Sequence, residues 1–200
     1  MPRNVEYFFT PVSPFTYLGH EHFVAIAGRH AVSVDVKPVD LGRVFPVSGG
    51  LPLKQRAPQR QAYRLVELAR WSKHLGLPLH LQPRHFPVSP ELASKWILAA
   101  QALQGAEGAL KLSGALLRAV WAEERNIADA DTLAAVATEQ GLDAKALAER
   151  AGAADIGTRY DAVTKEAIDR QIFGAPTYVY RDELFWGQDR LDFLDRALAK

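Results

Sequence analysis

The chain has 200 residues, and its 48% apolar content is enough to build the core of one large domain, or of a domain that carries an insertion. Its 24 basic and 23 acidic residues leave a net charge of +1 with no long run of one sign, which argues against nucleic acid or a membrane surface as a partner and favours a small-molecule ligand. The sequence contains no cysteine, so disulfides, thiolate metal sites and a cysteine nucleophile are excluded, and any sulfur chemistry must arrive with a ligand.

The start of the chain predicts a strand, a helix and a second strand. Apolar residues alternate over 5–9 and again over 32–36, as in short strands, and residues 13–30 have helical character. A crossover of this kind normally joins parallel strands. Because no apolar run reaches 18 residues and the first residues have no secretory-signal pattern, we expect a cytoplasmic protein without a transmembrane segment.

The middle of the chain predicts helices. Residues 39–57 are rich in glycine and proline and predict a loop, and helical periodicity then continues to about residue 172 without a convincing strand. Asp131, Asp143 and Asp155 are plausible N-caps of shorter helices in this block.

Strand character returns at 177–180 and 183–185, on either side of a polar tight turn, and an amphipathic helix ends the chain. The element order βαβ, helical block, ββα predicts an α/β protein with a thioredoxin-like fold and an all-helical domain inserted after the second strand. The predicted domains are a discontinuous thioredoxin-like domain, 1–50 with 173–200, and an inserted helical domain, 51–172.

A serine–proline pair stands where the first strand gives way to the helix. Ser13 at the N-cap and Pro14 at the first helical position form a strong helix start, because the serine oxygen accepts an orphan N–H and proline has none to lose. The same geometry also suits a catalytic role, since a helix N-terminus stabilises an anion such as a thiolate. Capping and catalysis are both open for Ser13 on this pattern.

Two later stretches also allow a structural and a functional interpretation. Pro176 precedes a strand, where a trans bond is the default; in a thioredoxin fold a cis-proline occupies this place and exposes the backbone of the preceding residue, here Ala175, to an extended peptide ligand. Gln188 and Asp189 precede the last helix, either as capping residues or as an amide and a carboxylate that bind the ammonium end of a ligand.

Three ordered stretches together carry a resemblance: SPFTYLG at 13–19, FGAPT at 173–177 and WGQDRL at 186–191. With AYRLVELARWSKHLGLPL and RHFP between them, the chain resembles the 2-hydroxychromene-2-carboxylate isomerase family. That family is related to kappa-class glutathione transferases and, more distantly, to DsbA oxidoreductases. The resemblance covers essentially the whole chain.

The resemblance implies a glutathione site in a cleft between the two domains. Ser13 would be the catalytic residue that holds the glutathione sulfur, with Phe15 beside it, and the remaining cofactor-binding residues would be Ala175, Pro176, Trp186, Gly187, Gln188 and Asp189. It also implies a homodimer. A DsbA-like redox role does not transfer, because the chain has no cysteine.

The implied activity is the cis–trans isomerisation of 2-hydroxychromene-2-carboxylate to trans-o-hydroxybenzylidenepyruvate, an aromatic keto acid, in the breakdown of naphthalene-type compounds. Glutathione would be a catalyst that adds and leaves again. One alternative is a kappa-like glutathione transferase, which keeps the adduct as product. A second alternative is a non-catalytic thioredoxin-like binding module.

The chain departs from the family pattern near the expected substrate. Naphthalene-pathway members carry a lysine shortly after a D-L-x-R-V stretch, where this chain continues with Phe45, and kappa-class members have an asparagine in the loop that here spans 48–52. Lys54 and Arg56 lie on or beside that loop and are candidates to bind the substrate carboxylate, with Arg56 favoured for its bidentate guanidinium.

Phe86 follows a predicted helix end and is a candidate for the wall of the substrate pocket; core packing is its alternative. The histidines show no convincing ligand spacing, so no metal site is predicted.

Overall fold

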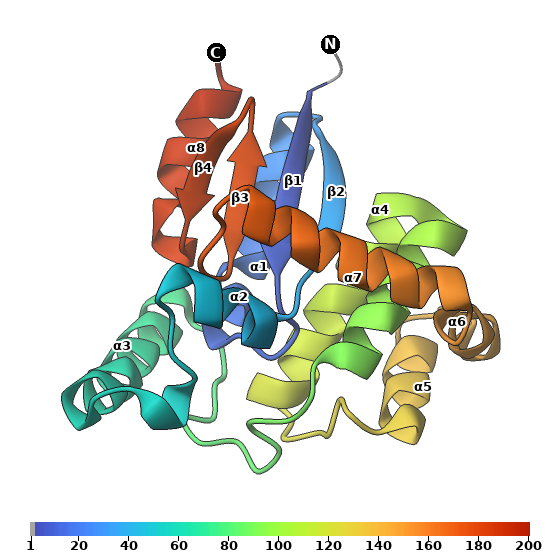
Figure 1. The fold of residues 1–200 in the computed structure, drawn as a ribbon, viewed down its shortest axis with the longest axis horizontal. Coiled ribbons are helices and arrows are strands. Elements are labelled where there is room, and N and C mark those ends of the chain that lie inside the picture. Colours follow the sequence, from blue (N-terminus) through green and yellow to red (C-terminus); the bar gives the residue numbers. More distant parts are fainter. Residues whose placement is uncertain (1–2) are drawn as a thin grey trace.

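A computed structural model describes residues 3–200, and its centre is a four-stranded sheet in the order β2-β1-β3-β4. The parallel pair is β1 (Asn4–Phe9) with β2 (Ser33–Pro38), joined through the helix α1 (Pro14–Arg29). β1 also pairs antiparallel with β3 (Thr177–Tyr180), which pairs antiparallel with β4 (Glu183–Trp186). With the final helix, this is the predicted thioredoxin-like arrangement (Figure 1).

Helices fill the chain between β2 and β3, as predicted. They are α2 (Leu41–Ser48), the 3-10 helix η1 (Leu53–Gln55), α3 (Pro58–Leu75), α4 (Glu91–Trp121), α5 (Ala130–Glu139), α6 (Ala144–Ala151) and α7 (Ala154–Asp169). A second 3-10 helix, η2 (Gln188–Arg190), leads into α8 (Leu191–Leu198). Within residues 3–200, no helix combines the length and apolar character needed to cross a bilayer.

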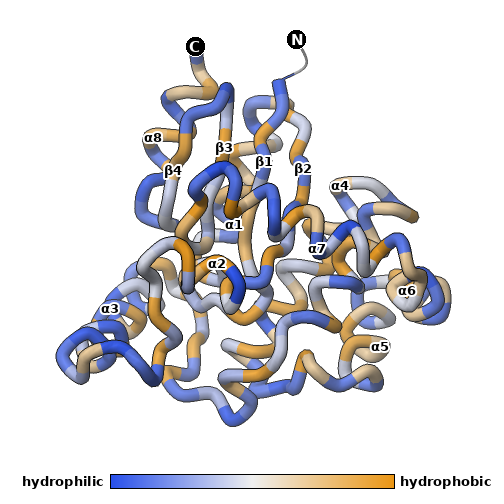
Figure 2. The backbone as a smooth tube through the Cα atoms, in the orientation of Figure 1, coloured by the Kyte–Doolittle hydropathy of each residue, from blue (hydrophilic) through white to orange (hydrophobic). Residues whose placement is uncertain are grey.

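The two faces of the sheet carry separate apolar clusters. Alternation along β1 sends Tyr7 into the larger cluster with Phe23 of α1, and sends Phe8 into a smaller one with Val44 of α2 and Val163 of α7. Figure 1 shows α7 crossing one face of the sheet while α1 covers the other, and Figure 2 shows hydrophobic residues along the strands between them. Both faces are therefore covered, as a sheet with a parallel pair requires.

The helix α7 lies inside the predicted insertion and yet packs on the sheet. It contributes Val163 and Ala167 to the smaller cluster, beside Phe8 and Val179 of the strands. The predicted domain limits, 1–50 with 173–200 and 51–172, stay a prediction.

Two local predictions were wrong. The segment predicted as a loop contains α2, because Asp40 caps its start by accepting from the Gly42 N–H at 2.8 Å and because Val44 is fully buried. The N-caps of α5 and α7 are Asp129 and Ala153, each two residues before the predicted aspartate, while Asp143 caps α6 as predicted.

A paired ionic network fixes α7 to the strands. The buried Lys37 ammonium donates to Glu6 at 2.7 Å and to Glu166 at 2.6 Å, and Arg170 donates to the other Glu6 oxygen at 2.5 Å. Burial opposes the charged form of Lys37, but the hydrogen bonds to Glu166 and Glu6 outweigh it and raise its pKa. Every charge in the network has a partner, which a buried ion needs to be tolerated.

A buried histidine ties α1 to its neighbours on the opposite face. A backbone carbonyl can only accept, so His20 Nε2 carries the proton and donates to the Leu110 carbonyl of α4 at 3.0 Å. Nδ1 then accepts from the Tyr7 hydroxyl of β1 at 3.2 Å. Burial lowers the pKa of His20 to about 4, against the opposing effect of the Leu110 carbonyl, so the ring is neutral near pH 7.

Glycine lets α1 approach η2 closely. A Cβ on Gly19 would lie 2.6 Å from the Gln188 Cβ and 3.3 Å from the Tyr178 hydroxyl. Gln188 is only 6% exposed, so it has no room to retreat. Gly28, on the same helix, has nothing within 4 Å of its Cβ position.

We expect Gly19→Ala to lower the free energy of unfolding by about 1–3 kcal/mol, because the added methyl must push η2 away from α1. Gly28→Ala is the matched control and should be neutral or stabilising by up to about 1 kcal/mol. Urea denaturation measures both variants. Equal effects of the two substitutions would contradict the close approach.

His20 should make stability depend on pH. The unfolded chain, with an ordinary histidine pKa of about 6.5, binds the proton more tightly than the folded chain, so the free energy of unfolding should fall as pH drops from about 6.5 to about 4. The loss is on the order of 3 kcal/mol. Urea denaturation across this pH range should show that the wild type and His20→Gln differ less in their free energy of unfolding as the pH falls. The control His22→Gln, at an exposed histidine, should show the same pH dependence as the wild type. A difference in the free energy of unfolding that stays constant with pH would exclude His20 as the cause of the pH dependence.

Candidate active site

The predicted site segments meet at one end of the sheet. β1 and β2 run toward this end, β3 starts there and β4 finishes there (Figure 1). The register pairs Phe8 with Thr177 and Thr177 with Trp186. Pro176 therefore lies between the end of β1, which leads into Ser13, and the end of β4.

Ser13 is the N-cap of α1. Its Oγ accepts from the Thr16 N–H at 3.2 Å, its N–H donates to the Thr10 carbonyl at 3.0 Å, and the residue is 8% exposed. Pro14 occupies the first turn, and that turn contains no acidic residue. The capping bond uses an oxygen lone pair and leaves the hydroxyl proton free to be donated, so capping and anion binding are compatible here.

The Ala175–Pro176 bond is cis, as the thioredoxin-like interpretation of this stretch implied, and not trans, as the default for a proline before a strand. The Pro176 carbonyl accepts from the Gly187 N–H at 2.9 Å, and Thr177 Oγ1 donates to the Gly174 carbonyl at 2.8 Å, so both sides of the turn are fixed. Within the described chain, the half-buried Ala175 makes no backbone hydrogen bond to another residue. Its backbone is therefore available to pair with a ligand.

Trp186 forms an exposed wall next to this turn. Its ring is 45% exposed, lies 4.9 Å from the Phe173 ring, and has the Arg190 guanidinium over its face at 5.9 Å. Glycine at 174 lets this ring lie close to the turn, because a Cβ there would be 2.6 Å from the indole nitrogen and the ring would have to shift.

The three residues after Trp186 differ in accessibility. Gly187 has a φ of 95°, in the left-handed region, which turns the chain sharply after β4. The Asp189 carboxylate is partly exposed and pairs with Arg190. The Gln188 side chain instead packs beneath α1 against Gly19, so it shapes the turn.

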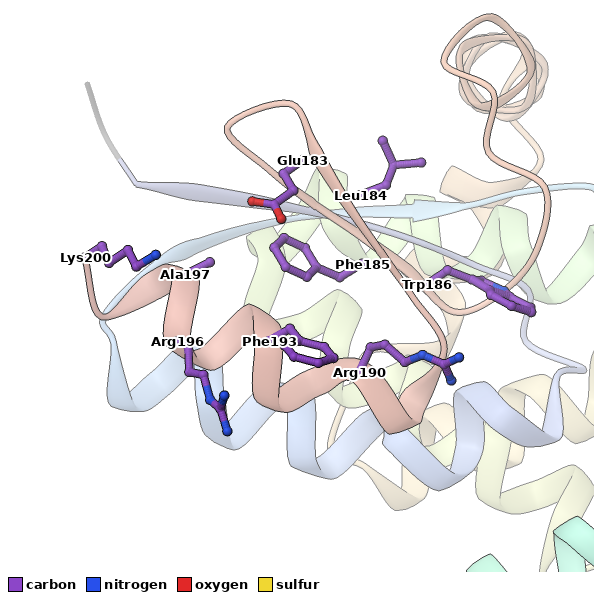
Figure 3. A pocket seen from close by; sticks show the side chains of 9 residues that line it. All are labelled: Glu183, Leu184, Phe185, Trp186, Arg190, Phe193, Arg196, Ala197 and Lys200. Carbon is purple, nitrogen blue, oxygen red and sulfur yellow. The ribbon is translucent and has the colours of Figure 1, made fainter.

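A groove of about 520 Å³ runs between β4 and α8 (Figure 3). Of the predicted site residues, only Trp186 lines it, and the figure shows this ring pointing away from Phe193. Its other lining residues are Glu183, Leu184, Phe185, Arg190, Phe193, Arg196, Ala197 and Lys200. The groove therefore lies beside the end of the sheet that carries Ser13 and Pro176, along the edge strand.

The predicted substrate residues lie on a separate part of the chain. Lys54 is exposed on η1, and Arg56 follows it, with Nε donating to the Leu51 carbonyl at 2.8 Å and the guanidinium 5.9 Å from the Phe45 ring. No hydrogen bond joins Lys54 or Arg56 to Ser13 among residues 3–200. The favoured candidate, Arg56, thus already has a partner.

The two aromatic candidates are partly buried. Phe15, two residues after the N-cap, packs on the larger apolar cluster. Phe86 also packs there, with its ring 4.8 Å from the fully buried Trp121. The Arg64 guanidinium lies 5.4 Å from the Phe86 ring, a neighbour that sequence periodicity on α3 gave no reason to select.

Comparison with known proteins agrees with this geometry. Residues 4–199 match the model of the DSBA-like thioredoxin domain. The 2-hydroxychromene-2-carboxylate isomerase of Pseudomonas putida is 31% identical, with 98% of this chain and 94% of that protein covered. The chain belongs to the 2-hydroxychromene-2-carboxylate isomerase family, within the DsbA-like thioredoxin superfamily.

One solved structure and a more distant relative extend the comparison. A solved 2-hydroxychromene-2-carboxylate isomerase superimposes with a TM-score of 0.81 at 28% identity, covering 98% of this chain and 94% of that one. Human glutathione S-transferase kappa 1 is 24% identical, with 100% of this chain and 92% of that protein covered. Membership of this isomerase family makes the protein an isomerase by class, as its sequence motifs predicted.

Proposed function

We propose that the protein is a glutathione-dependent cis–trans isomerase that interconverts 2-hydroxychromene-2-carboxylate and trans-o-hydroxybenzylidenepyruvate. The observation that carries this proposal is the Ser13 hydroxyl at the start of α1, at the end of the sheet where Pro176 also lies, in a chain without cysteine. Membership of the family supports the isomerisation, and the chemistry of the helix end supports a thiol that is supplied by glutathione.

The residues present fit glutathione. Ala175 has free backbone groups for a peptide ligand, and Ser13 has a free hydroxyl proton at a helix end with no acidic residue in its first turn. The exposed Trp186 ring and the Asp189 carboxylate lie on the far side of Pro176, where they would meet the γ-glutamyl end. Phe15, Gly187 and Gln188 would complete the site by packing and by shaping the turn.

Glutathione, when bound, supplies a thiolate that adds reversibly to a conjugated system and so allows rotation about a former double bond. Ser13 keeps that sulfur ionised by donating its hydroxyl proton as a hydrogen bond, and the positive end of the α1 dipole adds to this effect. Ala175 would orient the peptide through its backbone N–H and carbonyl groups.

A kappa-like glutathione transferase is the second candidate. The chain has Phe45 where naphthalene-pathway members carry a substrate lysine, so the substrate pocket differs from theirs, and the human kappa enzyme is also a full-length relative. Both candidates use the same activated sulfur. A transferase releases the glutathione adduct as its product, whereas an isomerase eliminates the thiol again.

The family resemblance adds three further parts to the proposal. The protein would be a homodimer, it would be cytoplasmic, and it would act in the breakdown of naphthalene-type aromatics.

We expect Ser13→Ala to lower turnover by orders of magnitude while removing only about 1 kcal/mol of stability, the usual effect of losing a cap. The thiol pKa of bound glutathione, followed by ultraviolet titration of the thiolate, should rise toward its solution value in this variant. Asp143→Ala is the matched control, since it removes the cap of α6 and should leave turnover unchanged. Full activity of Ser13→Ala would make the serine a capping residue only.

A stoichiometric assay separates the candidates. We expect isothermal titration to show glutathione binding, and turnover of the chromene to leave the concentration of free glutathione constant, because an isomerase regenerates the thiol. Loss of glutathione in step with product would identify a transferase. Absence of turnover, with affinity for peptides, would indicate a binding module.

A further inference from the structure

Arg64 on α3 differs from the other half-buried arginines. Within residues 3–200, its guanidinium takes part in no hydrogen bond and no ion pair. The remaining half-buried arginines each donate to an oxygen of another residue; they are Arg56, Arg125, Arg150, Arg159 and Arg170. A guanidinium has five donors, so a partly buried one without an acceptor is unusual.

Two aromatic rings hold the Arg64 guanidinium. It lies 5.4 Å from the centre of the Phe86 ring and 5.7 Å from that of Trp121, and these two rings contact each other at 4.8 Å. The faces of aromatic rings stabilise the cation but accept none of its N–H groups in the plane of the guanidinium. We call Arg64, Phe86 and Trp121 the arginine–aromatic cluster.

The cluster has positive charge, and no carboxylate of residues 3–200 pairs with it. Burial, and then the neighbouring charge of Arg56, lower the pKa of Arg64 to about 10, so it remains protonated at neutral pH. Arg56 satisfies its Nε by the Leu51 carbonyl and does not supply an anion. The indole N–H of Trp121 is a second buried donor with no acceptor in the described part of the chain.

The cluster belongs to the helical layer that packs on α1. α3 contacts α1, the helix capped by Ser13, and the Tyr17 hydroxyl of α1 donates to the Pro78 carbonyl, in the segment that joins α3 to α4, at 2.7 Å. Phe86 lies on the same connecting segment. Arg64 therefore lies on the side of the molecule where α3 and the segment after it pack against α1.

We propose that Arg64 binds the carboxylate of an aromatic carboxylic acid, whose ring packs on Phe86, and that it selects such acids as substrates. A carboxylate can accept two parallel N–H bonds from a guanidinium, while the aromatic rings hold the guanidinium plane in place. The assignment rests on the proposed function, whose substrate is an aromatic keto acid, and it replaces Arg56 as the carboxylate-binding residue.

Paired acid and amide ligands test the assignment. Isothermal titration with trans-cinnamate and trans-cinnamamide, in the presence of glutathione, isolates the carboxylate from the ring. The wild type should prefer the acid, and Arg64→Leu should weaken acid binding about ten- to a hundredfold, the effect of a lost charge-assisted pair, while the amide is little affected. Arg64→Lys should recover part of the preference, because it restores the charge without the fork.

Arg70→Leu is the matched control: it removes an exposed arginine from the same helix and should leave both affinities unchanged. In the turnover assay, Arg64→Leu should raise KM for the chromene by a similar factor and change kcat little. If Arg64→Leu weakens the binding of acid and amide equally, or weakens neither, the role of Arg64 is purely structural and the assignment is wrong.

The outcomes separate this assignment from the proposed function. Turnover of the chromene with an unchanged KM in Arg64→Leu would refute the role of Arg64 and leave the isomerase intact. An acid preference that depends on Arg64, in a protein that does not turn over the chromene with glutathione, would refute the isomerase and keep the carboxylate site.

Discussion

A serine hydroxyl at the start of a helix can accept one hydrogen bond and donate another, and in this protein the two capacities are divided. Ser13 Oγ accepts from the Thr16 N–H, which completes the first turn of α1, and its proton is left for another acceptor. The first turn has no acidic residue to neutralise the helix end. An anion that reaches this point meets a hydrogen-bond donor and the positive end of the dipole together, and the rest of the proposed chemistry depends on this.

This division is useful only if the helix end stays in place, and α1 is fixed by contacts on several sides. His20 joins it to β1 and α4, Gly19 permits close packing on η2, and Tyr17 joins it to the segment after α3. Of these elements, η2 also carries Gln188 and Asp189, and the segment after α3 carries Phe86. The position of Ser13 relative to Pro176 is thus set by the whole core.

The distribution of charge partners distinguishes the two ends of the molecule. Around α7, the cations Lys37 and Arg170 share the carboxylates of Glu6 and Glu166. On α3, by contrast, Arg64 has aromatic neighbours, and in the described part of the chain no carboxylate pairs with it. Oxidoreductases, transferases and isomerases share this fold, so the side chains of the pocket, and not the fold, decide the reaction and the substrate.

The sequence by itself determined the order of the elements, the helix start at Ser13 and the turn before β3, because local periodicity and capping chemistry are properties of neighbouring residues. It missed α2, whose glycine and proline content predicts a loop, since the burial of Val44 against the far face of the sheet is a long-range contact. It also selected Arg56 as a substrate-binding candidate and gave no reason to consider Arg64. Only the tertiary structure decided the surroundings of these arginines, because it brings Phe86 and Trp121, which are distant in the chain, to the Arg64 guanidinium and supplies Arg56 Nε with the Leu51 carbonyl.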